Sequence, residues 1–167
     1  FGIPIKIDLY PPEELALIIR RSAQILNCSI SDDAVMDIAL CSRGTPRIAN
    51  RILRRIRDIA DVKGNGKITR EMTQLGLDKL GIDKYGLDKT DRDILRIIAE
   101  VYNGGPVGLE ALAASLNDSS DTIEVYYEPY LMRQGYLKRT TRGRCLTQKA
   151  YEVLNIGDMY VNQGFLL

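Results

Sequence analysis

The chain has 167 residues, 45% of them hydrophobic, which is enough to bury a core in one large domain or two small ones. Its 23 basic and 22 acidic residues nearly cancel, but they cluster in different stretches, so local charge is more informative than the net charge of +1. The chain contains no histidine, which excludes Ser-His-Asp and Cys-His nucleophile chemistry and removes the commonest metal ligand.

The three cysteines, Cys28, Cys41 and Cys145, stand far apart and show no C-x-x-C spacing. They predict neither a disulfide framework nor a metal site, and they fit a protein of the reducing cytoplasm. No run approaches the roughly 18 apolar residues of a membrane span, so no membrane partner is expected. The chain starts at Phe1 without an initiator methionine or a signal-peptide pattern, so we expect part of the protein to lie upstream.

The first half of the chain predicts four short helices with tight joints. Residues 3–9 alternate apolar and polar side chains, which indicates an extended stretch before the first helix. The helix starts carry prolines or capping hydroxyls, at Pro11-Pro12, Ser31, Thr45-Pro46 and Thr69. Glycines and charges between Gly81 and Lys89 interrupt this pattern, so a first domain is predicted over residues 1–82.

A second domain is predicted over residues 83–156, and residues 157–167 form a tail without an assigned role. Its expected elements are helices from Thr90, at 109–116 and from Ser119 or Ser120 to Gly135, strands at 136–140 and 144–147, and a last helix at 148–154. Pro129, inside the third helix, predicts a bend. Three helices followed by a hairpin is the winged-helix order. With the four helices of the first domain, the predicted fold class of the chain is mainly α.

Arg47 lies one residue after Pro46, in the first turn of a predicted helix. A cation is unfavourable at this end of the helix dipole unless an anion is also bound, so the position is a candidate phosphate site. The guanidinium would supply a permanently charged fork for phosphate oxygens. On spacing alone, a solvated charged stripe is the favoured interpretation, made of Arg47, Arg51, Arg54, Arg55 and Asp58.

The predicted hairpin is strongly basic. Between Tyr136 and Lys149 it carries five cations and no acid, and the cations are Lys138, Arg139, Arg142, Arg144 and Lys149. Such a finger can lie along a phosphate backbone, and we favour this interpretation over that of an ordinary exposed hairpin.

The helix before the hairpin, which stands in the place of a recognition helix, is acidic. Its acids are Asp121, Glu124 and Glu128, and on this helix only Arg133 opposes them. Base readout uses Arg, Lys, Asn or Gln, so we expect the hairpin to hold DNA without regard to sequence. Tyr127 and Tyr130 fall on the apolar face of the helix and are expected in the core.

No G-x-x-x-x-G-K-[ST] loop is present, and no pair of carboxylates forms a recognisable catalytic site. Nothing in this chain would cradle a triphosphate or hold magnesium on it. The chain is therefore not expected to hydrolyse ATP by itself, and it has no predicted catalytic residue.

The segment Gly44-Thr45-Pro46-Arg47-Ile48-Ala49-Asn50-Arg51 resembles the lid of the bacterial RuvB proteins. Further segments resemble the same family in the same order, and these are Gly104 to Leu109, Glu128 to Leu131, Gln134 to Tyr136 and Arg139 to Arg144. The resemblance runs from Phe1 to about Asn155.

This resemblance implies the lid and winged-helix parts of an AAA+ ATPase that drives Holliday junction branch migration in DNA recombination and repair. It implies a hexameric ring of RuvB subunits with RuvA as partner, RuvC as a further partner, and Mg-bound ATP in a large domain upstream. It places Tyr10, Pro46 and Arg47 at the nucleotide. It also places Arg139 and Arg144 at DNA, with Arg142 and Lys138 beside them.

Two other functions fit parts of the pattern. A winged-helix transcription regulator with a helical sensor domain would explain both domains, but the acidic third helix argues against it. A protein-interaction module could dock the basic hairpin on an acidic partner. The preferred ligand separates these functions. A DNA-holding hairpin should bind any duplex, a regulator should prefer one operator, and an interaction module should bind a protein.

Overall fold

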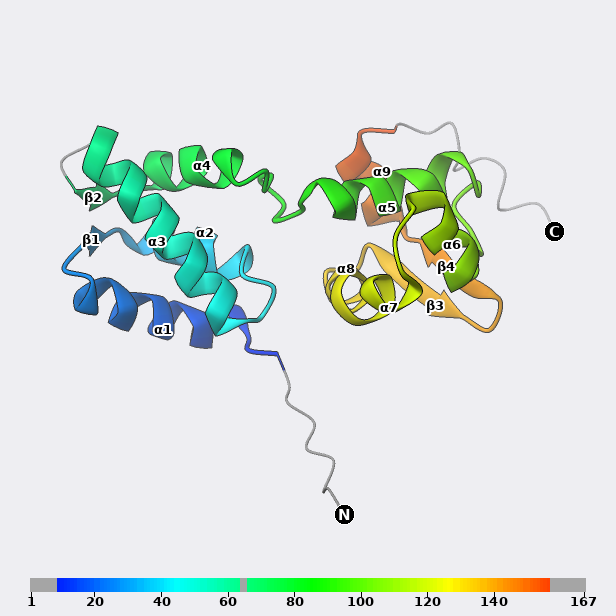
Figure 1. The fold of residues 1–167 in the computed structure, drawn as a ribbon, viewed down its shortest axis with the longest axis horizontal. Coiled ribbons are helices and arrows are strands. Elements are labelled where there is room, and N and C mark those ends of the chain that lie inside the picture. The colour runs from blue at the N-terminus through cyan, green and yellow to red at the C-terminus, as the bar shows by residue number, and fades with distance from the viewer. Residues whose placement is uncertain (1–8, 64–65, 157–167) are drawn as a thin grey trace, which may run out of the picture. The chain divides into compact units, whose positions relative to one another are not determined.

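The computed structural model describes residues 9–63 and 66–156. The chain divides into two compact units, Phe1–Leu87 and Asp88–Leu167 (Figure 1). The extended stretch predicted at 3–9 lies outside the described residues, apart from its last residue. Within the described part of the chain, no helix is both long and apolar enough to cross a bilayer.

The first unit contains the four predicted helices: α1 (Pro12–Ile25), α2 (Asp32–Leu40), α3 (Pro46–Lys63) and α4 (Arg70–Lys79). Two of the predicted caps are confirmed. The Ser31 hydroxyl accepts a hydrogen bond from Ala34 N–H at 3.4 Å, and the Thr69 hydroxyl accepts one from Met72 N–H at 3.3 Å. These bonds satisfy amides that have no partner inside their helices.

The apolar faces of these helices form the core of the first unit. Its largest fully buried side chains are Leu15, Ile19, Ile38, Ile52, Leu53, Ile56 and Ile68. Each such burial contributes roughly 1.5–3 kcal/mol relative to exposure. Close contact of α3 with α4 depends on Gly76, because a Cβ atom there would lie 2.5 Å from Cγ1 of Ile56.

Two short strands, which the sequence did not predict, join the loops of the first unit. β1 (Ser29–Ile30) pairs in parallel with β2 (Lys67–Ile68), and Ser31 N–H donates to the Ile68 carbonyl at 3.0 Å. This pairing connects the α1–α2 loop to the α3–α4 loop. Two-residue strands are too short to show a period of two in the sequence.

The second unit follows the predicted winged-helix order. Its elements are α5 (Lys89–Glu100), α6 (Leu109–Leu116), α7 (Ser120–Thr122), η1 (Ile123–Tyr127), α8 (Glu128–Arg133), β3 (Leu137–Thr140), β4 (Gly143–Leu146) and α9 (Gln148–Leu154). The start of α5 was predicted at Thr90, and this is wrong. Asp88 is the cap, because its carboxylate accepts from Asp91 N–H while the Asp91 carboxylate accepts from Asp88 N–H, both at 2.9 Å.

A π-helical turn lies just before Pro129, the residue at which the sequence predicts a bend. In η1, Glu128 N–H donates to the Ile123 carbonyl, five residues earlier. Pro129 has no N–H, so the ladder of helical hydrogen bonds is interrupted at this point in any case. The helical run from Ser120 to Arg133 therefore continues through η1 and ends before Gly135, whose φ of 77° reverses the chain.

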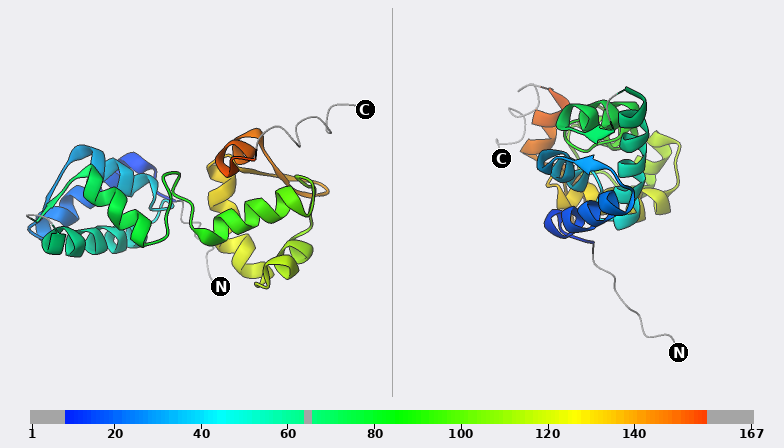
Figure 2. Two further views of the ribbon diagram at one scale, coloured as in Figure 1. Left: turned by 90° about the horizontal axis from the view of Figure 1, so that it is seen from above. Right: turned by 90° about the vertical axis from the view of Figure 1, so that its left-hand side faces the viewer.

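The β3–β4 hairpin, drawn in orange, projects from the body of the second unit (Figure 2). Val107 forms a bridge to Arg144, with N–H···O bonds of 2.8 and 2.9 Å in both directions. Gly143 and Gly105 permit this approach: a Cβ at Gly143 would collide with the Val107 carbonyl oxygen, and one at Gly105 with the Arg144 carbonyl oxygen. The Gly104-to-Leu109 segment thus lies along β4, from Leu146, whose N–H donates to the Gly104 carbonyl, to Gly143 beside the turn.

Candidate functional site

In the first unit, Tyr10 lies against the Gly44-to-Arg47 turn. Tyr10 N–H donates to the Gly44 carbonyl at 2.8 Å, and the Tyr10 side chain is 39% exposed. This bond places the Tyr10 backbone beside Gly44, two residues before Pro46, so the predicted nucleotide-facing residues Tyr10, Pro46 and Arg47 belong to neighbouring segments of the first unit.

Arg47 itself is exposed in the first turn of α3. Its side chain makes no hydrogen bond or ion pair with residues 9–63 or 66–156. Amides in the first turn of a helix have no partner within that helix, and the dipole there favours an anion. Arg47 and the start of α3 are thus arranged so that they can accept a phosphate group.

In the second unit, the hairpin register sorts the basic residues onto two faces. Arg139 and Arg144 stand directly opposite each other, next to the buried pair Leu137 and Leu146. Side chains alternate along a strand, so Arg139 and Arg144 share the inner face of the hairpin, and Lys138 points to the other face.

Arg144 is buried in the second unit. Its Nε and Nη2 atoms donate to Oε2 of Glu128 at 3.0 and 2.8 Å, and the side chains of Arg144 and Glu128 are only 8% and 4% exposed. A buried charge pair of this kind holds two segments in a fixed position, here α8 and β4.

Arg139 is held by the same helix but at its surface. Its Nη2 donates to Oε1 of Glu124 at 2.7 Å, and its Nε lies 3.6 Å from Oε1 of Glu128. The Arg139 side chain is 51% exposed. The hydrogen bond to Glu124, followed by the charge of Glu128, raises the pKa of Arg139 above its usual value.

The expectation that only Arg133 opposes the acids of the third helix was incomplete. Glu124 and Glu128 face Arg139 and Arg144, while Asp121 is exposed and has no side-chain partner among the residues that the structure describes. Sequence reasoning missed this network. Two signals were available: the acids are four residues apart on one helix face, and the arginines fall opposite each other in the hairpin.

The tyrosines of this helix differ in burial. Tyr130 is buried, as predicted, whereas Tyr127 is half-buried and Tyr126 is 45% exposed. Tyr126 and Tyr127 meet edge to face with 4.9 Å between ring centroids.

The remaining hairpin cations also differ. Lys149 donates to the Gln134 carbonyl at 2.6 Å and lies over the Tyr136 ring, so it supports the fold. Lys138 and Arg142 are exposed, and within the described residues their side chains form no ion pair or hydrogen bond. Of the five predicted cations, these two are the ones available to an external anion without the loss of an internal contact.

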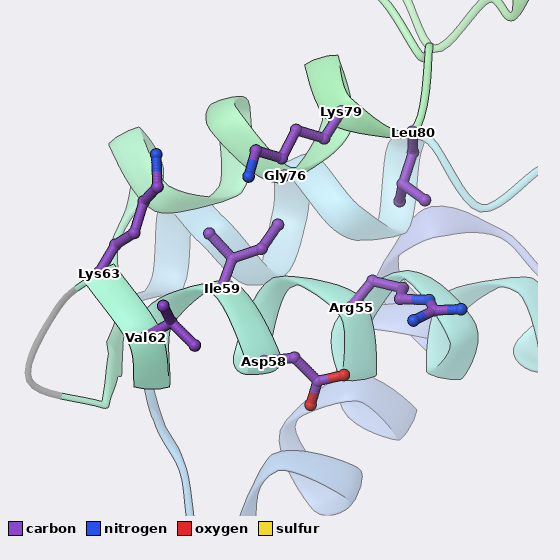
Figure 3. A pocket seen from close by; sticks show the side chains of 8 residues that line it. All are labelled: Arg55, Asp58, Ile59, Val62, Lys63, Gly76, Lys79 and Leu80. Atoms are coloured by element: carbon purple, nitrogen blue, oxygen red, sulfur yellow. The ribbon is translucent and has the colours of Figure 1, made fainter.

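The first unit also contains a pocket of about 480 Å³ between α3 and α4 (Figure 3). Ile59 projects from α3 toward Gly76 on α4, and the rest of the lining consists of Val62, Leu80 and the charged residues Arg55, Asp58, Lys63 and Lys79. The sequence did not predict this pocket, and none of the predicted site residues lines it.

The cysteine thiols of the first unit are not activated nucleophiles. Burial raises the pKa of Cys41 to about 12, and burial also raises the pKa of Cys28. Among the described residues, no three His, Cys, Asp or Glu side chains gather in a way that could hold a metal ion.

The geometry defines a class of protein: a small helical lid of the AAA type joined to a winged helix whose charged hairpin is packed on an acidic helix. Two family models match the chain accordingly. The RuvB AAA lid domain matches residues 10–83, and the RuvB C-terminal winged helix domain matches residues 84–155. The chain belongs to the RuvB family.

Individual relatives agree with this. The chain is 52% identical over 164 residues to the Holliday junction branch migration complex subunit RuvB of Treponema denticola, and 48% identical over 163 residues to that of Pediococcus pentosaceus. Each match covers 98% of this chain and 48% of the relative, so the chain spans about half the length of these relatives.

Among solved structures, the Thermotoga maritima RuvB Holliday junction branch migration motor is similar, with a TM-score of 0.88 and 48% identity. The match covers 93% of this chain and 52% of that one. A solved mutant of the same Thermotoga protein gives the same TM-score at 47% identity.

The buried pair predicts a large effect on stability. Glu128→Gln removes the buried carboxylate that pairs with Arg144 and leaves it only the half-exposed carboxylate of Glu124, 3.7 Å from Nη2, so it should destabilise the second unit by roughly 3–5 kcal/mol. Replacing both partners, as Glu128→Gln with Arg144→Met, should recover part of this loss. Urea unfolding followed by tyrosine fluorescence measures these changes.

The matched control is Arg142→Ala, which removes an exposed hairpin arginine without an internal partner and should change stability by less than about 0.5 kcal/mol. An equal effect of Glu128→Gln and Arg142→Ala would contradict a structural role for the pair.

Proposed function

We propose that this chain is the lid and DNA-holding part of an ATP-driven motor that moves Holliday junctions in DNA recombination and repair. The observation that carries the proposal is the pair of exposed hairpin cations, Lys138 and Arg142, which have no side-chain partner in the described part of a RuvB-family winged helix. The printed names of the relatives, which describe a Holliday junction branch migration complex, support the same function.

In this proposal the hairpin holds the DNA backbone. Lys138, Arg142 and the exposed edge of Arg139 contact phosphates, and Arg144 contributes by holding β4 on α8 through Glu128. Phosphate contacts carry no sequence information. The acidic residues of the helix from Ser120 to Arg133 discourage its entry into a groove, so the DNA is bound without regard to sequence.

The lid residues Tyr10, Pro46 and Arg47 face the nucleotide. Tyr10 would line the adenine side, and Arg47 would contact phosphate oxygens, a role that its exposure and the absence of an internal partner in the described residues support. ATP bound there would supply the free energy of hydrolysis. Magnesium would be held by an ATPase domain that precedes this chain.

The partners follow from the same proposal. They are double-stranded DNA at Holliday junctions, other RuvB subunits in a hexameric ring, and RuvA, with RuvC as a further partner. The setting is the cytoplasm. Arg47 would respond to the charge of the bound nucleotide, so that the lid and the winged helix move with the state of the ring.

The DNA-holding role predicts a sequence-independent loss of affinity. In the 167-residue chain, Lys138→Gln with Arg142→Gln should weaken binding to duplexes and four-way junctions by a similar factor for every sequence. The slope of log K against log salt should flatten by about 0.9 for each lost phosphate contact. Fluorescence anisotropy at several salt concentrations measures both quantities.

Lys149→Gln is the matched control, because Lys149 already has internal partners and should affect the salt slope less. Strong binding confined to one operator sequence would favour a transcription regulator instead. Salt-insensitive binding to a protein, without DNA affinity, would favour an interaction module.

The nucleotide role of Arg47 predicts a loss of coupling in the motor that joins this chain to its ATPase domain. Arg47→Ala removes a charged hydrogen-bond donor, so branch migration should fall roughly tenfold or more while the fold stays intact. Arg51→Ala, one turn further along the exposed side of α3, should have little effect. Normal ATP-driven branch migration by the Arg47 variant would refute the role.

A further inference from the structure

The two shortest ion pairs between the third helix and the hairpin differ in their access to solvent, and Oε1 of Glu124 also lies 3.7 Å from Nη2 of Arg144. Arg144 and Glu128 are 8% and 4% exposed, whereas Arg139 and Glu124 are 51% and 43% exposed. The inner pair cannot open without exposing a buried charge, but the outer pair can exchange its partners at the surface.

Glu124 presents to Arg139 the kind of group that DNA would present. The short 2.7 Å contact joins a guanidinium nitrogen to an anionic oxygen, which is also the chemistry of an arginine–phosphate contact. A phosphate that approaches Arg139 therefore meets the negative charge of Glu124, which already accepts a hydrogen bond from one nitrogen of the Arg139 guanidinium. The carboxylate and the phosphate repel each other and compete for the same guanidinium.

Glu128 keeps Arg139 in place during such an exchange. The Oε1 atom of Glu128 accepts no hydrogen bond from any described residue and lies 3.6 Å from Nε of Arg139. Arg139 can thus turn its outer nitrogens from Glu124 to a phosphate while its Nε stays beside a second carboxylate.

We propose that Glu124 is the internal counterion that a DNA phosphate replaces on Arg139, so that Glu124 limits the affinity of the hairpin for DNA. This inference rests on the proposed DNA-holding function of the hairpin. Because Glu124 competes with the phosphate, the hairpin binds the DNA backbone weakly enough to release it. A protein that moves along DNA must break and remake its phosphate contacts, and an internal carboxylate supplies a replacement partner for the arginine at each release.

The test compares two variants of the 167-residue chain that lose the same charge. Glu124→Gln removes the counterion of Arg139, and Asp121→Asn removes an exposed acid from the same helical run that does not contact Arg139. From the strength of half-exposed ion pairs, Glu124→Gln should tighten binding to a fluorescein-labelled duplex about two- to fivefold. Asp121→Asn should change it less. Equal effects of the two variants would overturn the inference, because they would reflect only the general field of the helix.

The second arm repeats Glu124→Gln in an Arg139→Gln background. If Glu124 acts through Arg139, its substitution should have almost no effect there, and a gain of affinity as large as in the parent chain would also overturn the inference. Thermal unfolding of each variant shows that the winged helix stays folded. If neither the parent chain nor Glu124→Gln binds DNA, the proposed function fails and the inference fails with it. DNA binding that depends on Lys138 and Arg142 but not on Glu124 removes the inference alone.

Discussion

The buried ion pair between Glu128 and Arg144 is the contact on which the rest of the winged helix depends. Arg144 connects three segments, because its side chain bonds Glu128 on α8, its backbone bonds Val107 in both directions, and its strand pairs with β3. Arg139 stands directly opposite, and two facing arginines repel each other. The acids of the helix remove this repulsion, and in doing so they fix the direction in which the hairpin projects.

This arrangement decides which charges remain available to a ligand. Four of the charged groups, Glu124, Glu128, Arg139 and Arg144, form a neutral network. The free positive charge of the hairpin is then concentrated at Lys138 and Arg142. The hairpin, whose charged residues in the sequence are all basic, is therefore a rigid support with a basic edge, which suits contacts to a phosphate backbone.

Much of the fold could be predicted from the sequence, because long amphipathic helices and their caps are local features. The four lid helices, the winged-helix order and the caps at Ser31 and Thr69 follow from spacing and side-chain chemistry. The β1–β2 pairing could not be predicted, because its strands have two residues each and lie far apart in the sequence. The capping box at Asp88 was missed because Thr90 offered a competing cap nearby.

The candidate sites were predictable only in part. Arg47 was a candidate because of its place at a helix start, whereas Tyr10 and Pro46 were identified through their likeness to a family. The Tyr10–Gly44 hydrogen bond, which places Tyr10 beside this turn, joins segments that no sequence spacing connects. In the hairpin, counting cations overestimated the charge available to a ligand, because the partners of Arg139 and Arg144 lie on another element. Ion pairs between elements depend on packing, and packing is a property of the folded chain.

We propose that the hairpin, and not the third helix, holds DNA. Chemical modification of lysine and arginine side chains, read by mass spectrometry with and without duplex DNA, tests it most directly. DNA should protect Lys138 and Arg142, while Arg133, exposed on α8, should stay reactive. Protection of Arg133 with full reactivity of Lys138 and Arg142 would show that the third helix, and not the hairpin, holds DNA.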